Sequence, residues 1–169
     1  MGLLRRRADE PMGRRFRMRE KLLSIGDDFW IEDDAGNRAY RVDGKAMRLR
    51  ETILLKDASD REVAKIQERK LSIRDKMAIE REGETIATVH KALVGIRDRF
   101  AIEVEGGPDL KAHGNIVDHE YEIERDGETV ARVSKRWFRV RDTYGVELAA
   151  GEDEGLLLAA VVALEALTD

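Results

Sequence analysis

The feature that most constrains the fold is the apolar run at the C-terminus, residues 155–167, in which Glu165 is the only charged residue. As a helix this run would be about 20 Å long, which is shorter than the ~30 Å hydrocarbon core of a bilayer. Asp153 is a suitable N-cap, and Glu154 favours the positive end of the helix dipole. A helix that is apolar all round is buried on all sides. We therefore predict a buried helix over about residues 153–168, kept slim by its alanines.

The body of the chain repeats itself. Segment 79–104 aligns without a gap to segment 123–148, and nearly half of the aligned positions are identical. Shorter copies start near Val63 and Ala39. A unit of this size cannot bury its own apolar face, so several units must share one core. The dipeptide Arg-Asp recurs in three units, where it ends at Asp75, Asp98 and Asp142, and we interpret it as a local turn or a rim ion pair.

Within each unit, apolar residues recur at every second position, as in Ala87 and Val89. This is the period of a strand with one buried face. The parity of the apolar positions changes near 90–93 and 134–137, which predicts a turn or bulge there. Turn residues separate the runs, and a meander of about twelve short strands closes on itself. The predicted fold is mainly β: a closed antiparallel barrel of about twelve strands around one buried C-terminal α-helix.

Charge divides the chain into two parts. The net charge is −4, but residues 1–21 are strongly basic. We interpret residues 1–14 as a basic N-terminal arm, which contacts phosphates, anionic lipid or the barrel, or is a solvated tail. Residues 15–169 are one predicted domain. The absence of cysteine excludes disulfides and thiolate chemistry, and no signal peptide or transmembrane segment is predicted.

The histidines provide little evidence for catalysis. His113 with Asp118 and His119 could supply a metal site, but no metal-binding spacing is present, and the alternative is that they decorate a hairpin at Gly114-Asn115. His90 falls on the outward face of its strand and is expected to be solvated. No Gly-rich phosphate loop or nucleophile elbow is present. We expect no catalytic residue, no metal site and no cofactor.

Basic surface is the better indication of function. Two stripes of basic residues lie opposite apolar positions, the second with a tryptophan beside it. They could hold phosphates or anionic lipid headgroups, with the indole at an interface. The alternative is an ordinary solvated strand face, paired across strands with Glu and Asp. The candidate ligand-binding residues are Lys45, Arg48, Arg50, Lys135, Arg136, Trp137, Arg139 and Arg141.

The chain also resembles a known family, the LURP-one-related proteins, over about residues 15–168. The segments that carry this resemblance are 29–36, 40–45, 55–57, 64–66 and 72–79. The family shares the tubby C-terminal-like fold with tubby proteins and phospholipid scramblases. The resemblance implies a closed barrel around a central helix. It also suggests phosphoinositide or membrane chemistry, but no tubby phosphoinositide motif can be carried over residue by residue.

A barrel filled by its own helix has no lumen, so any site must lie at the rim or on the outer surface. We expect a non-catalytic barrel that binds an anionic ligand, such as a phospholipid headgroup, on its outside. A protein-interaction or scaffold domain is the first alternative, and an enzyme with a site at the rim is the second. Expected partners are an anionic membrane surface or another protein, but not nucleic acid. We expect a soluble cytoplasmic protein, with peripheral attachment to a membrane left open, as is its oligomeric state.

Overall fold

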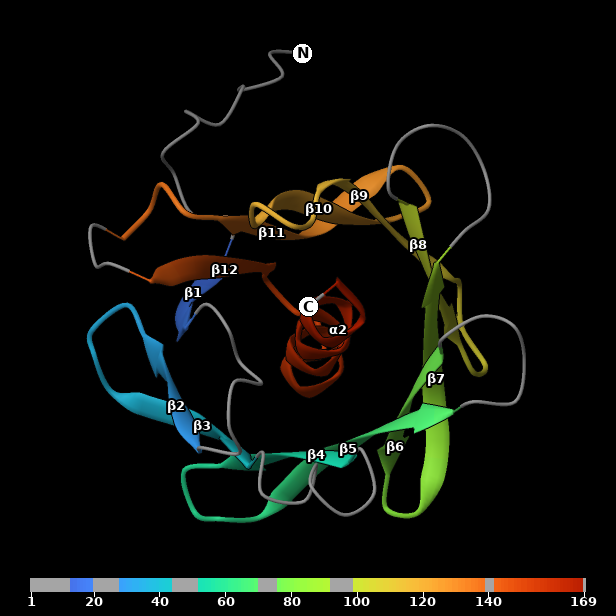
Figure 1. Ribbon diagram of the computed structural model, residues 1–169, viewed down its shortest axis with the longest axis horizontal. Helices are drawn as coiled ribbons and strands as arrows, with labels where there is room; N and C mark the ends of the chain where they lie inside the picture. Colours follow the sequence, from blue (N-terminus) through green and yellow to red (C-terminus); the bar gives the residue numbers. More distant parts are fainter. Residues whose placement is uncertain are drawn as a thin grey trace.

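The chain forms a closed β-barrel around a single helix, as Figure 1 shows for the computed structural model. The structure describes residues 13–19, 28–43, 52–69, 76–91, 99–138 and 142–168. Within these residues, twelve antiparallel strands make one sheet, and the predicted fold class is confirmed. The first two residues described, Gly13 and Arg14, already belong to the barrel wall, and the rest of the expected basic arm lies outside the described residues.

The strands are short and follow one another around the wall. In chain order they are β1 (Gly13–Arg19), β2 (Phe29–Asp33), β3 (Arg38–Asp43), β4 (Thr52–Asp57), β5 (Glu62–Arg69), β6 (Lys76–Arg81), β7 (Glu84–Lys91), β8 (Arg99–Val104), β9 (Leu110–Asn115), β10 (Glu120–Arg125), β11 (Glu128–Ser134) and β12 (Thr143–Ala149). Each strand pairs with its neighbours in sequence, and β1 pairs with β12 to close the barrel.

Tight turns make the hairpins, as the sequence predicts. In the β6–β7 hairpin Glu82 and Gly83 both have positive φ, and in the β10–β11 hairpin Asp126 and Gly127 do the same. Two consecutive positive φ angles are typical of the type I′ turn, whose twist matches that of the strands it joins. The register shifts at Ile79/Glu80 in the first hairpin and at Ile123/Glu124 in the second, so the two aligned sequence segments have their irregularities at matching positions.

The predicted hairpin turn at Gly114-Asn115 is wrong. Strand β9 runs through both residues, and the turn follows at 116–119. Gly114 serves the pairing of two strands instead, because a Cβ at this position would lie 2.8 Å from the carbonyl oxygen of Glu120 on β10. The glycine therefore marks a close approach of two backbones, a role that sequence alone does not separate from a turn.

The predicted phase change between repeat halves coincides with the ends of strands. β7 ends at Lys91 and β11 ends at Ser134. Asp142 has a φ of 57° in a turn immediately before β12, which agrees with the predicted local turn at this position, whereas Arg141 lies outside the described residues. Asp75 and Asp98 lie outside the described residues.

The helix α2 (Glu154–Thr168) fills the barrel. Every residue from Leu157 to Leu164 is at most 1% exposed, and the alanines among them allow the surrounding strands to approach closely. The inward side chains of the strands, such as Ala87 and Val89, are also fully buried. The predicted central helix is confirmed. Within the described part of the chain, no helix is long and apolar enough to cross a bilayer.

Asp153 fixes the start of α2 to the wall. Its Oδ1 accepts a hydrogen bond from the backbone N–H of Leu156 at 3.1 Å, as an N-cap does. Arg81 of β6 donates to both carboxylate oxygens of Asp153, each at 2.9 Å. The hydrogen bond from Arg81 holds the pKa of Asp153 below its usual value. The helix entry is therefore tied to β6 by a forked ion pair.

Glu154 provides a second tie at the same end. Arg14 of β1 donates to Glu154 at 2.7 Å, and the Tyr40 hydroxyl of β3 donates to the same carboxylate at 2.7 Å. Burial of the phenol, together with the hydrogen bond to Glu154, raises the pKa of Tyr40 well above its usual value. The first turn of α2 thus has polar contacts on both sides of the barrel mouth, and the orientation of the helix is fixed.

Candidate functional site

Only some of the predicted ligand-binding residues can be placed. Lys45, Arg48, Arg50, Arg139 and Arg141 lie outside the described residues. The other three form the segment that follows β11, where Lys135 and Arg136 are exposed and Trp137 is half-buried.

Trp137 packs against the outer face of the wall. Its ring lies 4.8 Å from the guanidinium carbon of Arg15 on β1. A Cβ added to Gly145 of β12 would lie 2.6 Å from the Trp137 ring and 3.0 Å from the ring of Phe138, so this glycine makes room for both aromatic side chains. The segment 135–138 therefore forms a second layer over β12.

A row of outward-facing polar residues crosses the barrel wall from β8 to β1. Each member lies directly opposite the next in the strand register, and acidic residues alternate with basic ones over most of its length. This outer row consists of Arg99, His113, Glu122, Arg132, Glu147 and Arg15. Opposite charges on facing positions stabilise a sheet modestly.

The outer row is covered at its β12 end. The Nε of Arg15 donates to the Oε2 of Glu147 at 2.7 Å. The Glu147 side chain is only 1% exposed, although it points away from the barrel interior. The aromatic segment 135–138 accounts for this burial, because it packs against Gly145, two residues before Glu147, and against Arg15. At this end the charges are paired and shielded from water.

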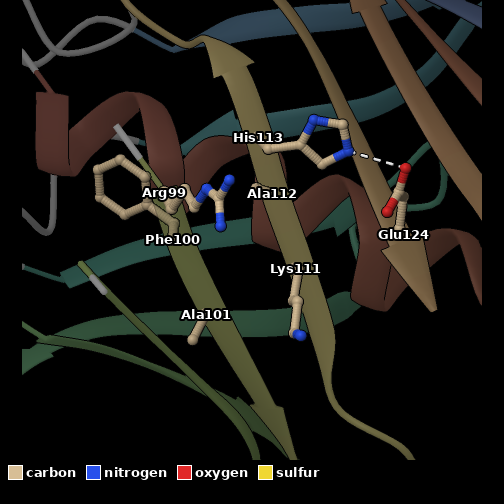
Figure 2. A pocket seen from close by; sticks show the side chains of 7 residues that line it. All are labelled: Arg99, Phe100, Ala101, Lys111, Ala112, His113 and Glu124. Atoms are coloured by element: carbon tan, nitrogen blue, oxygen red, sulfur yellow. Dashed lines mark ion pairs between the residues drawn. The ribbon is translucent and has the colours of Figure 1, made fainter. Parts of the chain in front are cut away.

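At its β8 end the outer row borders a pocket. The hollow has a volume of about 540 Å³ and is lined by Arg99, Phe100, Ala101, Lys111, Ala112, His113 and Glu124. Figure 2 shows Arg99 and Lys111 projecting from β8 and β9 beside the small side chain of Ala101. Both basic residues are exposed, and within the described part of the chain neither has an acidic partner.

Glu124 is the acid of the pocket, and it is already engaged. Strand register places it opposite Lys111, but its carboxylate turns to His113, whose Nε2 lies 2.8 Å from Oε1 (Figure 2). The pocket therefore presents two basic groups, Arg99 and Lys111, that form no ion pair with Glu124. This arrangement can attract an anion.

The histidines lie in three different settings. The trio His113, Asp118 and His119 is not brought together: His113 faces outward on β9, Asp118 accepts a hydrogen bond from Asn115 in an exposed turn, and His119 is buried. A different group gathers at His113, whose ligand atom lies within 4.8 Å of carboxylate oxygens of Glu122 and Glu124. Of the described residues, this cluster has the composition to hold a metal.

The prediction that His90 is an outward-facing, solvated residue is only partly correct. It faces outward as predicted, but its side chain is only 16% exposed, and its Nε2 lies 3.1 Å from Glu103 on β8. It is paired and half-buried, and not solvated as predicted.

His119 belongs to a buried polar group at the other end of α2. Its Nδ1 lies 2.9 Å from Glu165, and the Tyr121 hydroxyl donates to the same carboxylate oxygen at 3.2 Å. The imidazole stacks on the Tyr144 ring with centroids 4.4 Å apart. Burial, and then the charge of Glu165, raise the pKa of Tyr121 well above its usual value. The one charged residue of the apolar run is thus held by specific partners.

Sequence reasoning missed the pocket and the cluster beside it. The alternation of Arg99 with Phe100 and of Lys111 with Ala112 indicates that both basic side chains face outward. This alternation can be read from the sequence. The sequence does not show the strand register, which sets Ala101 opposite Lys111 and His113 opposite Glu122.

Comparison with known proteins agrees with this architecture. A solved X-ray structure of a protein from Arabidopsis thaliana superposes with a TM-score of 0.65 over 92% of each chain, at 14% sequence identity, which shows a shared fold. No curated protein matches the sequence significantly. The family model described as LURP-one-related matches residues 14–165, which is nearly the whole barrel and its helix. The chain therefore belongs to the LURP-one-related family, as its strand units and terminal helix had suggested.

Proposed function

We propose that this barrel is a binding domain that takes a phosphate-bearing anionic ligand in the pocket on β8 and β9. The observation that supports this most directly is the pair of exposed basic residues, Arg99 and Lys111, which line the same hollow without an acidic partner in the described part of the chain. Like charges that share a pocket repel each other, so an anion bound between them relieves that repulsion.

The size and lining of the pocket agree with a small ligand. Its volume of about 540 Å³ lies within the usual range of small-molecule sites. Arg99 can present two parallel N–H groups to a phosphate, whereas Lys111 offers a compact point charge. Ala101, which lies opposite Lys111 on the outward face, supplies an apolar part of the lining. A lipid headgroup and a soluble phosphate ester share the chemistry that this pocket would recognise.

The filled interior also favours an outer site. The helix residues from Leu157 to Leu164 are almost fully buried, so they offer a ligand no accessible surface inside the barrel. An exposed pocket on the wall can reach a membrane surface, and attraction to anionic lipid is on the order of 1 kcal/mol for each basic residue near that surface.

Co-sedimentation with lipid vesicles tests the proposal. Vesicles of phosphatidylcholine alone are compared with vesicles of equal parts phosphatidylcholine and phosphatidylserine, across a salt series. We expect binding to the anionic vesicles that weakens as salt rises, and at least a tenfold weaker binding for Arg99→Glu and Lys111→Glu. Arg61→Glu is the matched control, since it makes the same charge change at an exposed turn between β4 and β5.

Competition separates the two sources of the ligand. If soluble glycerophosphate displaces the protein from vesicles, the pocket recognises the phosphate itself. If it binds the free protein while vesicles do not, the ligand is a soluble phosphate ester. Absence of binding to both probes at low salt contradicts the proposal, as does an equal loss of binding in the Arg61→Glu control.

A further inference from the structure

We infer that His113, Glu122 and Glu124 form a binding site for a divalent first-row transition metal on the outer wall. One ligand atom from each of the three residues lies within 4.8 Å of the others. The inference goes beyond the proposed function and does not depend on it, because Arg99 and Lys111, which support anion binding, take no part in the cluster.

Regular strand geometry brings the three side chains together. Glu122 and Glu124 are two residues apart on β10, so both face outward. His113 on β9 lies directly opposite Glu122 in the register. Facing residues of an antiparallel pair have Cβ atoms about 5 Å apart, which is within the reach of an imidazole and a carboxylate. The site therefore stands on two paired strands, a rigid base for metal ligands.

The donor set suits a metal such as Zn²⁺. Zinc is bound by imidazole nitrogen and carboxylate oxygen at about 2 Å, and sites with three protein ligands keep a fourth position for water or another ligand. Around such an ion the donor atoms stand roughly 3.3 Å apart. The Nε2 of His113 and the Oε1 of Glu124 are already 2.8 Å apart, so a small rotation of either side chain admits the ion. Their exposed fractions, 42% and 30%, leave a path for entry.

Neighbouring residues hold Glu122 in place. The Nε of Arg132 lies 3.2 Å from Oε1 of Glu122, and the hydroxyl of Thr129 donates to Oε2 at 3.3 Å. Outer partners of this kind orient carboxylate ligands in metal sites. The positive charge of Arg132 opposes the metal's charge, so we expect a site of moderate affinity.

Isothermal titration calorimetry of the full chain with zinc chloride, in the absence of any phosphate, tests the inference. We expect one bound ion, and an affinity at least about tenfold lower in His113→Ala and in Glu124→Gln. Visible absorption of bound Co²⁺ gives a second readout, since its intensity reports coordination by protein ligands. Circular dichroism checks that each variant is folded, which we expect because both side chains are partly exposed.

His90→Ala is the matched control. His90 faces one carboxylate, that of Glu103, and no third metal-binding residue joins this pair in the described part of the chain. Its loss should leave the zinc affinity unchanged. Equal zinc affinity in His113→Ala and the parent protein would contradict the inference, and so would a dependence on His90. Arg99→Glu separates the two proposals, because it should weaken anion binding at least tenfold without weakening zinc binding.

Discussion

The two ends of the outer row contain similar residues in different surroundings. At the β12 end, Glu147 lies between Arg15 and Arg132 in the register, and the aromatic segment 135–138 packs over this part of the wall. At the β8 end, Arg99 and Lys111 line an open pocket. At the covered end, removal of the Glu147 charge is expected to destabilise the fold. At the open end, the charges of Arg99 and Lys111 are exposed and available to bind a ligand. The layer above a strand face, more than the face itself, therefore decides whether a charge supports the fold or is available for binding.

The largest effect on stability is expected from a charge placed in the hydrophobic core inside the barrel, behind both ends of the outer row. Ala160→Arg buries an unpaired cation where the parent residue is 0% exposed, and should abolish cooperative folding. Thermal denaturation followed by circular dichroism measures this. Ala101→Arg makes the same substitution on the outer wall and should keep the fold while filling the pocket. A soluble Ala160→Arg protein with the parent's melting temperature would place α2 outside the barrel.

The next effect tests the covered end directly. Glu147→Ala leaves Arg15 without its 2.7 Å partner in a shielded position, and should lower the free energy of unfolding by about 3 kcal/mol. Glu124→Ala at the open end removes a partly exposed partner of His113 and should cost less than about 1 kcal/mol. Urea denaturation compares the two. Similar losses in both variants would mean that the ends do not differ in shielding.

A smaller effect is expected from the contact between the aromatic layer and the wall. Gly145→Ala places a Cβ 2.6 Å from the Trp137 ring, so the ring must shift, at a cost of about 1–2 kcal/mol. Tryptophan fluorescence should change in parallel. Gly107→Ala is the control, because its Cβ would meet only the Val104 side chain at an ordinary 3.6 Å. If Gly145→Ala changed neither the stability nor the tryptophan fluorescence, the aromatic segment would not be packed closely against β12.

The smallest effect is expected at the pocket itself. Arg99→Ala and Lys111→Ala remove exposed side chains without an acidic partner in the described residues, and should change the free energy of unfolding by no more than about 0.5 kcal/mol. Urea denaturation is again the measurement. A loss of more than about 1 kcal/mol in the free energy of unfolding would show that these residues stabilise the fold, and would contradict their assignment to ligand binding alone.

The sequence predicts the elements well because their signals are local. The apolar run ending at Leu167 indicates a buried helix, and the alternation around Ala87 and Val89 indicates strands with one inward face. The turn at Asp126-Gly127 follows from residues that tolerate positive φ. These features depend only on near neighbours, so periodicity and turn chemistry are enough to identify them.

For the site, the sequence predicts the type of residue but not the positions that come together. Outward basic residues were expected, but the pocket depends on which strand faces which, and that register is a property of the closed sheet. His113 meets Glu122 and Glu124 through the pairing of β9 with β10, whereas sequence proximity suggested Asp118 and His119. Glu147 looks like an ordinary surface acid until segment 135–138 is seen to cover it. Long-range packing decides each of these cases.

The pairing of Gly13–Arg19 with Thr143–Ala149 has a consequence for biosynthesis. The first described strand leaves the ribosome long before its partner exists, and until then both borders of the growing sheet carry unpaired backbone groups. The helix that occupies the centre is translated after the strands that surround it. Closure must therefore wait until β12 has been made, which is a contact pattern typical of slow folding and of nascent chains exposed to aggregation. A chain truncated before Glu154 would contain the strands of the sheet but lack the helix around which they close.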